Sequence, residues 1–79
     1  MREGLDELCL RRDALRESWR MVRVERLARR DELVAAGKSA SDVRADRIYR
    51  KLKKKQKGYT VQLKHVEGRI SRERAGGGR

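Results

Sequence analysis

Apolar residues recur at every third or fourth position along the first half of the chain, the spacing of one face of an α-helix. At about 100° per residue, a helix over residues 3–36 collects larger apolar side chains on one face: Leu5, Leu8, Leu15, Trp19, Val22 and Leu33. A weaker set lies nearly opposite: Leu10, Ala14, Met21, Val24, Ala28 and Ala35. We predict a long helix whose first face packs against another helix. The opposite face either contacts a neighbouring protein, through Leu10, Met21 and Val24, or is simply exposed, since single apolar side chains are common on protein surfaces.

Residues 37–42 contain a signal that ends the first helix and a signal that begins a second one. Gly37 comes just after the periodic residues, where glycine commonly ends a helix in the left-handed conformation. Ser39 and Asp42 have the spacing of a capping box, with Asp in place of Glu or Gln. We therefore predict a tight turn that makes two helices antiparallel neighbours.

A second, narrower apolar stripe predicts a helix from about residue 40 to about residue 72. Its members are Ala45, Ile48, Leu52, Tyr59, Leu63, Val66 and Ile70. A symmetric register would place Trp19 opposite Gly58, the largest side chain against the smallest. Glycine inside a helix costs about 1 kcal/mol relative to alanine, so the alternative is a break with a short third helix from Tyr59. We expect the helix to continue, straight or slightly kinked.

These patterns predict an all-α protein, an antiparallel two-helix hairpin or short coiled coil with helices over about 3–36 and 40–72. Residues 1–73 are expected to form a single basic domain, whose core is thin because the chain has only 79 residues. The remaining residues, 74–79, read RAGGGR. Three consecutive glycines disfavour a helix, so we expect a flexible tail.

Positive charge is concentrated in the second helix. The chain has 23 Lys or Arg against 12 Asp or Glu, and residues 44–57 contain eight basic residues but only one acid, Asp46. A run of one sign differs from the mixed charges of an ordinary solvated face and is typical of surfaces that bind phosphate. The predicted phosphate-binding residues are Arg44, Arg47, Arg50, Lys51, Lys53, Lys54, Lys55 and Lys57.

The expected nucleic acid is RNA, either ribosomal RNA or another structured RNA. No helix-turn-helix, zinc-finger or basic-zipper pattern is present to read a DNA groove, whereas basic helical arms suit folded RNA recognised through its backbone. Tyr49 lies among the basic residues. We expect it either to stack on an unpaired base, as a further nucleic-acid-binding residue, or to lie against the edge of the hairpin.

The sequence favours no catalytic, metal or cofactor site. Cys9 and His65 are the only residues of their kinds, which excludes an internal disulfide and a zinc site built from four such ligands. A hairpin also offers no enclosed cavity for a small-molecule substrate, so we expect no enzyme, no metal and no cofactor. The single cysteine favours an intracellular, reducing compartment, with cytoplasm and organelle matrix both open. No apolar run approaches the length needed to span a membrane.

Together these features predict a small non-enzymatic RNA-binding subunit of a larger ribonucleoprotein, ribosome-like in kind. Its second helix would contact phosphates and its first helix a neighbouring protein subunit. The alternative is a coiled-coil adaptor subunit of a multiprotein complex, whose positive face binds an acidic protein surface. Binding to a membrane surface is disfavoured, because the stripe of the second helix is narrow and has no Trp or Phe to anchor it.

Overall fold

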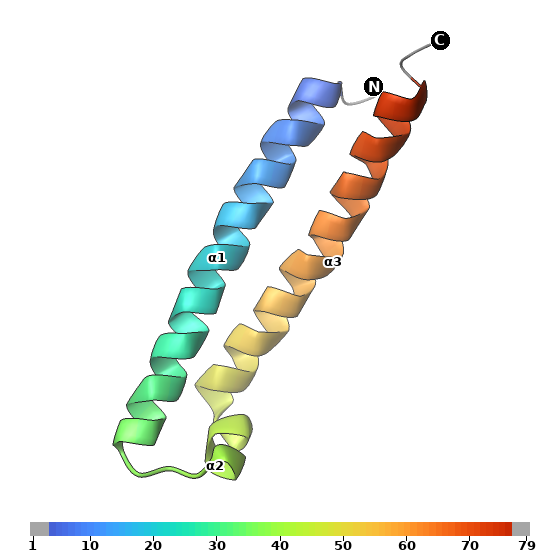
Figure 1. The fold of residues 1–79 in the computed structure, drawn as a ribbon. Helices are drawn as coiled ribbons and strands as arrows, with labels where there is room; N and C mark the ends of the chain where they lie inside the picture. Colours follow the sequence, from blue (N-terminus) through green and yellow to red (C-terminus); the bar gives the residue numbers. More distant parts are fainter. Residues whose placement is uncertain (1–3, 77–79) are drawn as a thin grey trace.

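The computed structural model describes residues 4–76 and is almost entirely helical. It contains α1 (Leu5–Ala35), the short α2 (Ala40–Ala45) and α3 (Arg47–Gly76), with no strand in this range. The two long helices lie side by side and antiparallel, and α2 sits at the turn between them (Figure 1). The molecule is a rod of 59 × 19 × 16 Å. The predicted all-α helical hairpin is therefore confirmed.

Gly37 ends α1 as its position in the sequence predicts. Its φ is +82°, in the left-handed region that glycine adopts without strain. The backbone N–H of Lys38 donates to the carbonyl of Leu33, and that of Gly37 donates to the carbonyl of Val34, both at 3.0 Å. These two bonds form a Schellman motif, which satisfies carbonyls that the last turn of a helix leaves without partners.

The predicted capping box starts α2. The backbone N–H of Asp42 donates to Ser39 Oγ at 3.1 Å, and the backbone N–H of Ser39 donates to Asp42 Oδ2, also at 3.1 Å. These bonds lower the pKa of Asp42 below its usual range, because they favour the ionised carboxylate. The turn is thus fixed by hydrogen bonds among residues close in sequence.

The prediction of one unbroken helix over residues 40–72 was wrong at Asp46. The backbone of Asp46 is extended there (φ −61°, ψ 131°), which separates α2 from α3. Its carboxylate Oδ2 accepts from the backbone N–H of Tyr49 at 2.9 Å, and its carbonyl accepts from the N–H of Arg50, also at 2.9 Å. Asp46 thus occupies the N-cap position of α3, a role that aspartate fills well. The sequence did not indicate this break, because the predicted apolar stripe continues past Asp46 from Ala45 to Ile48.

The ends of the hairpin also differ from the prediction. Helix α3 continues through Gly76 rather than ending near residue 72, so residues 74–76 of the expected flexible tail are helical. Residues 77–79 of that tail lie outside the described range, as does residue 3, the predicted start of the first helix. Within the described chain, α1 begins at Leu5, and Gly4 is its N-cap residue.

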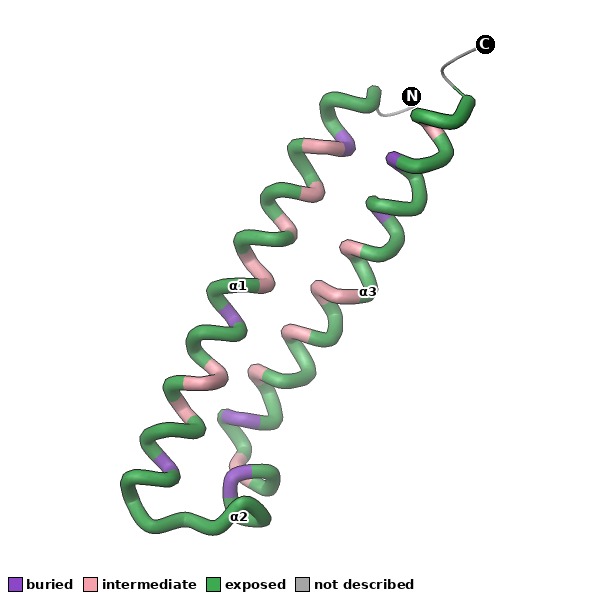
Figure 2. Tube along the Cα trace, viewed as in Figure 1, coloured by how far each residue is buried: buried purple, intermediate pink, exposed green. Residues whose placement is uncertain are grey.

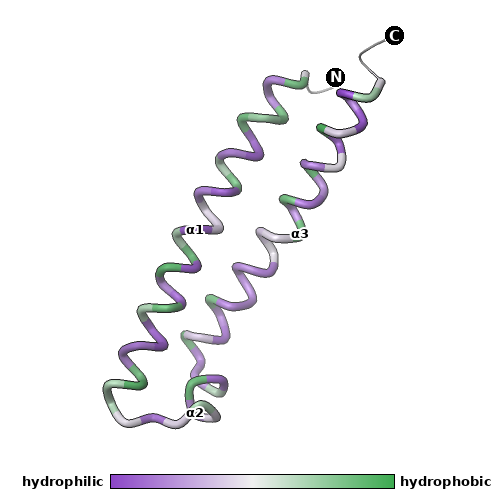
Figure 3. Tube along the Cα trace, viewed as in Figure 1, coloured by the Kyte–Doolittle hydropathy of each residue, from purple (hydrophilic) through white to green (hydrophobic). Residues whose placement is uncertain are grey.

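The core is a narrow seam between the two long helices. Buried and half-buried residues lie along the facing edges of α1 and α3 (Figure 2), while hydrophilic and hydrophobic residues alternate along both helices (Figure 3). One buried cluster, at the open end, consists of Leu8, Val66 and Ile70. The other, beside the turn, consists of Leu33, Val43 and Tyr49.

Polar contacts occupy much of the seam between these clusters. Trp19 Nε1 donates to Thr60 Oγ1 at 3.0 Å, and Arg26 Nε donates to Gln56 Oε1 at 2.7 Å. Each bond joins α1 to α3 and requires a partner at a defined position. These pairs therefore add defined partners to the register of the hairpin in a stretch where Val22 is also buried.

Gly58 does not accommodate Trp19, although a symmetric register would place the two residues opposite each other. A Cβ atom at Gly58 would meet no atom within 4 Å, and the indole of Trp19 bonds to Thr60 instead. Helix α3 nevertheless passes through Gly58 without interruption, as expected. The glycine is on the exposed side, so it weakens the helix without relieving any contact.

Two members of the predicted second stripe lie outside the core. Ile48 is 51% exposed, and Ala45 is also exposed, whereas Val43 and Tyr49 are buried in their place. The break at Asp46 is the cause, because the regular spacing of side chains around a helix, about 100° per residue, does not continue from α2 into α3. Tyr49 also buries more surface than Ile48 and finds a hydrogen-bond donor for its hydroxyl.

Candidate nucleic-acid interface

The eight predicted basic residues are all exposed. Seven belong to α3 and one, Arg44, to α2. They lie away from the buried positions of α3, since about 100° of rotation per residue carries them to its outer side. Long charged side chains in water keep their charge accessible to an anion, so the exposure needed for phosphate binding is present.

Most of these side chains line one open groove at the junction of α2 and α3. The groove has a volume of about 840 Å³. Its lining consists of Arg44, Ala45, Arg47, Arg50, Lys51, Lys53, Lys54 and Lys57. Seven of the eight lining residues are therefore basic, and none is acidic; Lys55 is exposed outside the groove. We call this feature the basic groove.

Asp46, the one acid of the basic segment, is paired with α1. Arg29 Nη2 donates to Asp46 Oδ1 at 3.0 Å and Arg29 Nε donates to Oδ2 at 3.1 Å, a two-pronged contact. The side chain of Asp46 is only 15% exposed. The guanidinium of Arg29, with the backbone N–H of Tyr49, lowers the pKa of Asp46, while the Asp46 carboxylate raises that of Arg29. The negative charge is therefore neutralised by α1, and the basic groove has no carboxylate of its own.

Tyr49 does not belong to the basic surface, which corrects its assignment as a base-stacking residue. It is 9% exposed and lies in the cluster with Leu33 and Val43. Arg26 Nη1 donates to its hydroxyl at 2.9 Å, and the Arg26 guanidinium carbon lies 5.7 Å from the ring centroid. The ring thus lies inside the hairpin, in line with the alternative that it packs against an edge.

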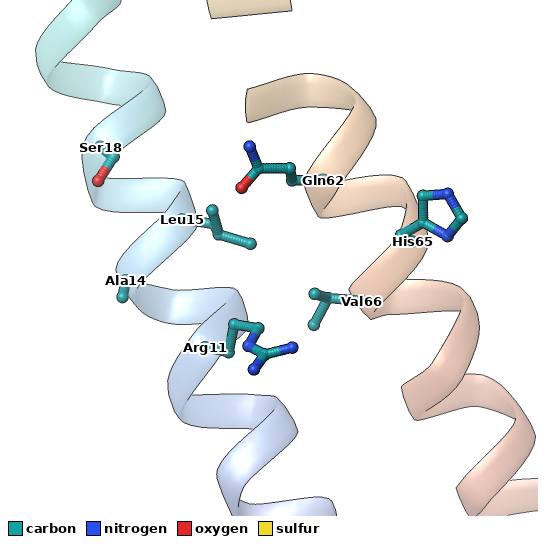
Figure 4. A pocket seen from close by; sticks show the side chains of 7 residues that line it. All are labelled: Arg11, Ala14, Leu15, Ser18, Gln62, His65 and Val66. Carbon is teal, nitrogen blue, oxygen red and sulfur yellow. The ribbon is translucent and has the colours of Figure 1, made fainter. Parts of the chain in front are cut away.

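A second, smaller groove lies between α1 and α3 nearer the open end (Figure 4). It has a volume of about 450 Å³ and is lined by Arg11, Ala14, Leu15, Ser18, Gln62, His65 and Val66. Leu15 and Val66 point toward each other across it, whereas His65 projects from α3 away from α1 (Figure 4). Cys9 packs instead against the cluster of Leu8, Val66 and Ile70.

Within residues 4–76, His, Cys, Asp and Glu form no group of three or more that would suit a metal ion. The same part of the chain contains no helix with the length and apolar character of a membrane span.

The outer face of α1 is uncovered. Leu10 is 70% exposed, Met21 58% and Val24 67%, and Ala14, Ala28 and Ala35 on the same face are exposed as well. The structure therefore leaves the predicted protein-contact residues accessible without showing what contacts them. Their role remains a prediction.

Comparison of the chain with protein-family models, curated proteins and solved structures found no match in any of the three.

Proposed function

We propose that this chain is a small non-enzymatic RNA-binding subunit of a larger ribonucleoprotein, and that the basic groove binds RNA phosphates. The observation that carries the proposal is the charge of the groove. Seven Lys or Arg side chains line it, while Asp46 is held by Arg29 from α1. Like charges at this density repel one another, and a phosphate backbone relieves that repulsion.

The two kinds of basic side chain in the groove suit different parts of this task. Arg44, Arg47 and Arg50 line the groove, and the planar guanidinium of an arginine can donate two parallel hydrogen bonds to phosphate oxygens. The lysines act as mobile point charges that follow an irregular backbone. This combination favours affinity for phosphate and gives little discrimination among bases, because phosphate contacts carry no sequence information directly.

The outer face of α1 supports the second half of the proposal. Leu10, Met21 and Val24 are exposed on the helix that contributes nothing to the lining of the basic groove. A neighbouring protein subunit packed on this face would leave the groove free for RNA. The same exposed face supports the alternative function, a coiled-coil adaptor bound to an acidic protein.

Charge reversal in the groove tests the proposal. A variant carrying Lys53→Glu, Lys54→Glu and Lys57→Glu should lose RNA binding, measured by fluorescence anisotropy with a labelled RNA stem-loop at physiological salt. Circular dichroism should show helicity unchanged, since all three side chains are exposed. A folded variant that binds with wild-type affinity would overturn the proposal.

The matched control changes the same total charge elsewhere. Arg20, Arg30 and Lys38 are exposed and lie outside the basic groove. A variant carrying Arg20→Glu, Arg30→Glu and Lys38→Glu should therefore retain most of the affinity. An equal loss in both variants would mean that net charge, rather than the groove, governs binding. Recovery from cell extract of an acidic protein partner, unaffected by nuclease, would instead favour the adaptor.

A further inference from the structure

The aromatic residues of the chain are all directed to the seam of the hairpin. The sequence contains one Trp, two Tyr and no Phe. The ring of Trp19 is covered by the Arg23 guanidinium, whose carbon lies 5.6 Å from the ring centroid, and its N–H bonds to Thr60. Tyr49 is buried and bonded to Arg26. Neither ring offers a free face next to the basic groove.

Tyr59 is the remaining aromatic residue, and it is half-buried. It follows Lys57 by two positions, which places it about 200° around α3 from that groove residue. It is therefore on the opposite side of the helix from the basic groove. The lining of the groove itself consists only of Arg, Lys and one Ala.

Single-stranded RNA is bound largely by stacking its unpaired bases on aromatic side chains, combined with a basic path for the backbone. The basic groove supplies the second of these and no aromatic ring; the planar groups in its lining are the guanidiniums of Arg44, Arg47 and Arg50. Paired RNA presents no free base faces and is recognised through the shape of its phosphate backbone and its 2′-hydroxyl groups. The composition of the groove thus matches the requirements of a double helix better than those of an unpaired strand.

The distribution of charge fits the same conclusion. At about 100° per residue, the six groove residues of α3 spread over about 160° of the helix, from Lys53 on one flank to Lys51 on the other. Arg44 adds a seventh charge from α2. A surface with basic side chains on two flanks meets two rows of phosphates, which a duplex presents across its groove and a single strand does not.

We infer that the basic groove binds the phosphate backbone of paired, double-helical RNA in preference to unpaired RNA. This inference rests on the proposed function. It narrows the expected ligand to double-helical stems of RNA and predicts that affinity does not depend on the base sequence of the stem.

The test compares two RNA probes with equal numbers of phosphates. One is a duplex of about 16 base pairs, the length that a typical double-stranded RNA module covers, and the other is a uridine-only strand, which does not pair with itself. Competition against a labelled duplex should show at least tenfold weaker binding of the single strand at physiological salt. A second duplex of unrelated sequence should compete as well as the first.

The outcomes distinguish RNA binding by the groove from the preference for paired RNA. If the single strand binds as tightly as the duplex, and reversal of Lys53, Lys54 and Lys57 abolishes both, RNA binding by the groove holds and the preference for paired RNA is wrong. If wild-type protein binds neither probe, both proposals are overturned. The control variant with Arg20→Glu, Arg30→Glu and Lys38→Glu should keep the preference for duplex RNA, and loss of that preference would assign it to net charge.

Tyr59→Leu supplies a further check, because Tyr59 is the remaining aromatic residue of α3 and is only half-buried. The variant should bind the duplex and the single strand as the wild type does. A selective loss of single-strand binding, with helicity retained, would reveal a stacking platform and contradict the inference.

Discussion

Replacement of Leu8 by alanine tests whether the open end of the hairpin depends on its small apolar cluster. Leu8 is 1% exposed and packs with Val66 and Ile70. Truncation of a buried leucine costs about 2–5 kcal/mol. The seam is narrow and its surroundings can relax inward, so we expect a value near the lower end, about 2–3 kcal/mol. A domain of this size has about 4–12 kcal/mol of stability in all, and the change should lower Tm by roughly 10–20 °C.

Leu10→Ala is the matched control. It removes the same atoms from the same helix two positions later, but Leu10 is 70% exposed. The expected change in the free energy of unfolding is within about 0.5 kcal/mol. Both variants should be measured by thermal and urea unfolding followed by circular dichroism at 222 nm, a standard helix wavelength, over a range of protein concentrations.

Equal destabilisation by the two substitutions would refute the reasoning, because it would mean that α1 buries its outer face in solution. A dependence of the Leu10→Ala effect on protein concentration would then point to self-association through that face. A negligible effect of Leu8→Ala would instead show that the open end is frayed in the wild type.

Three further predictions concern the turn, the junction and the groove. Ser39→Ala should cost about 1 kcal/mol by removing the capping box, seen in urea unfolding, whereas Ser41→Ala at an exposed neighbouring position should cost far less. The pKa of Asp46 is lowered in the folded state, so its contribution is present above the ordinary pKa of an aspartate and is lost as pH falls through the lowered value. Acid titration of unfolding should therefore show a shallower loss of stability in Asp46→Asn than in the wild type, and identical profiles would contradict the pairing with Arg29. Finally, seven phosphate contacts predict a slope of about −6 in a plot of log K for duplex binding against log salt. Each single Lys→Ala change in the groove should make that slope shallower by about one, and a slope near zero would exclude phosphate binding.

The helical hairpin was predictable because its determinants are local. Gly37, Ser39 and Asp42 act through bonds to residues within five positions, and the side-chain period of each long helix is visible without knowledge of the partner. Exposure of the basic residues followed as directly, since Lys and Arg are almost never buried without partners.

The junction was not predictable in the same way. Asp46 ends one helix and starts another because it bonds at once to Tyr49 N–H and to Arg29, which lies 17 residues earlier. The apolar stripe through Ile48 suggested continuity, whereas the local bond from Tyr49 N–H and the tertiary contact with Arg29 together favour the break. The shape of the basic groove follows from this break, so the charge of the site could be predicted and its geometry could not.

The two apolar clusters differ in the length of chain that must be closed to form them, which bears on the order of folding. Members of the cluster beside the turn are at most 16 positions apart, whereas Leu8 and Ile70 are separated by 62. Loop-closure entropy therefore favours the turn cluster by about 1 kcal/mol, in addition to the local bonds of the turn. We expect folding to nucleate there and to proceed along the seam toward the two termini. The basic groove adjoins this nucleus, at the end of the hairpin that forms first and opens last.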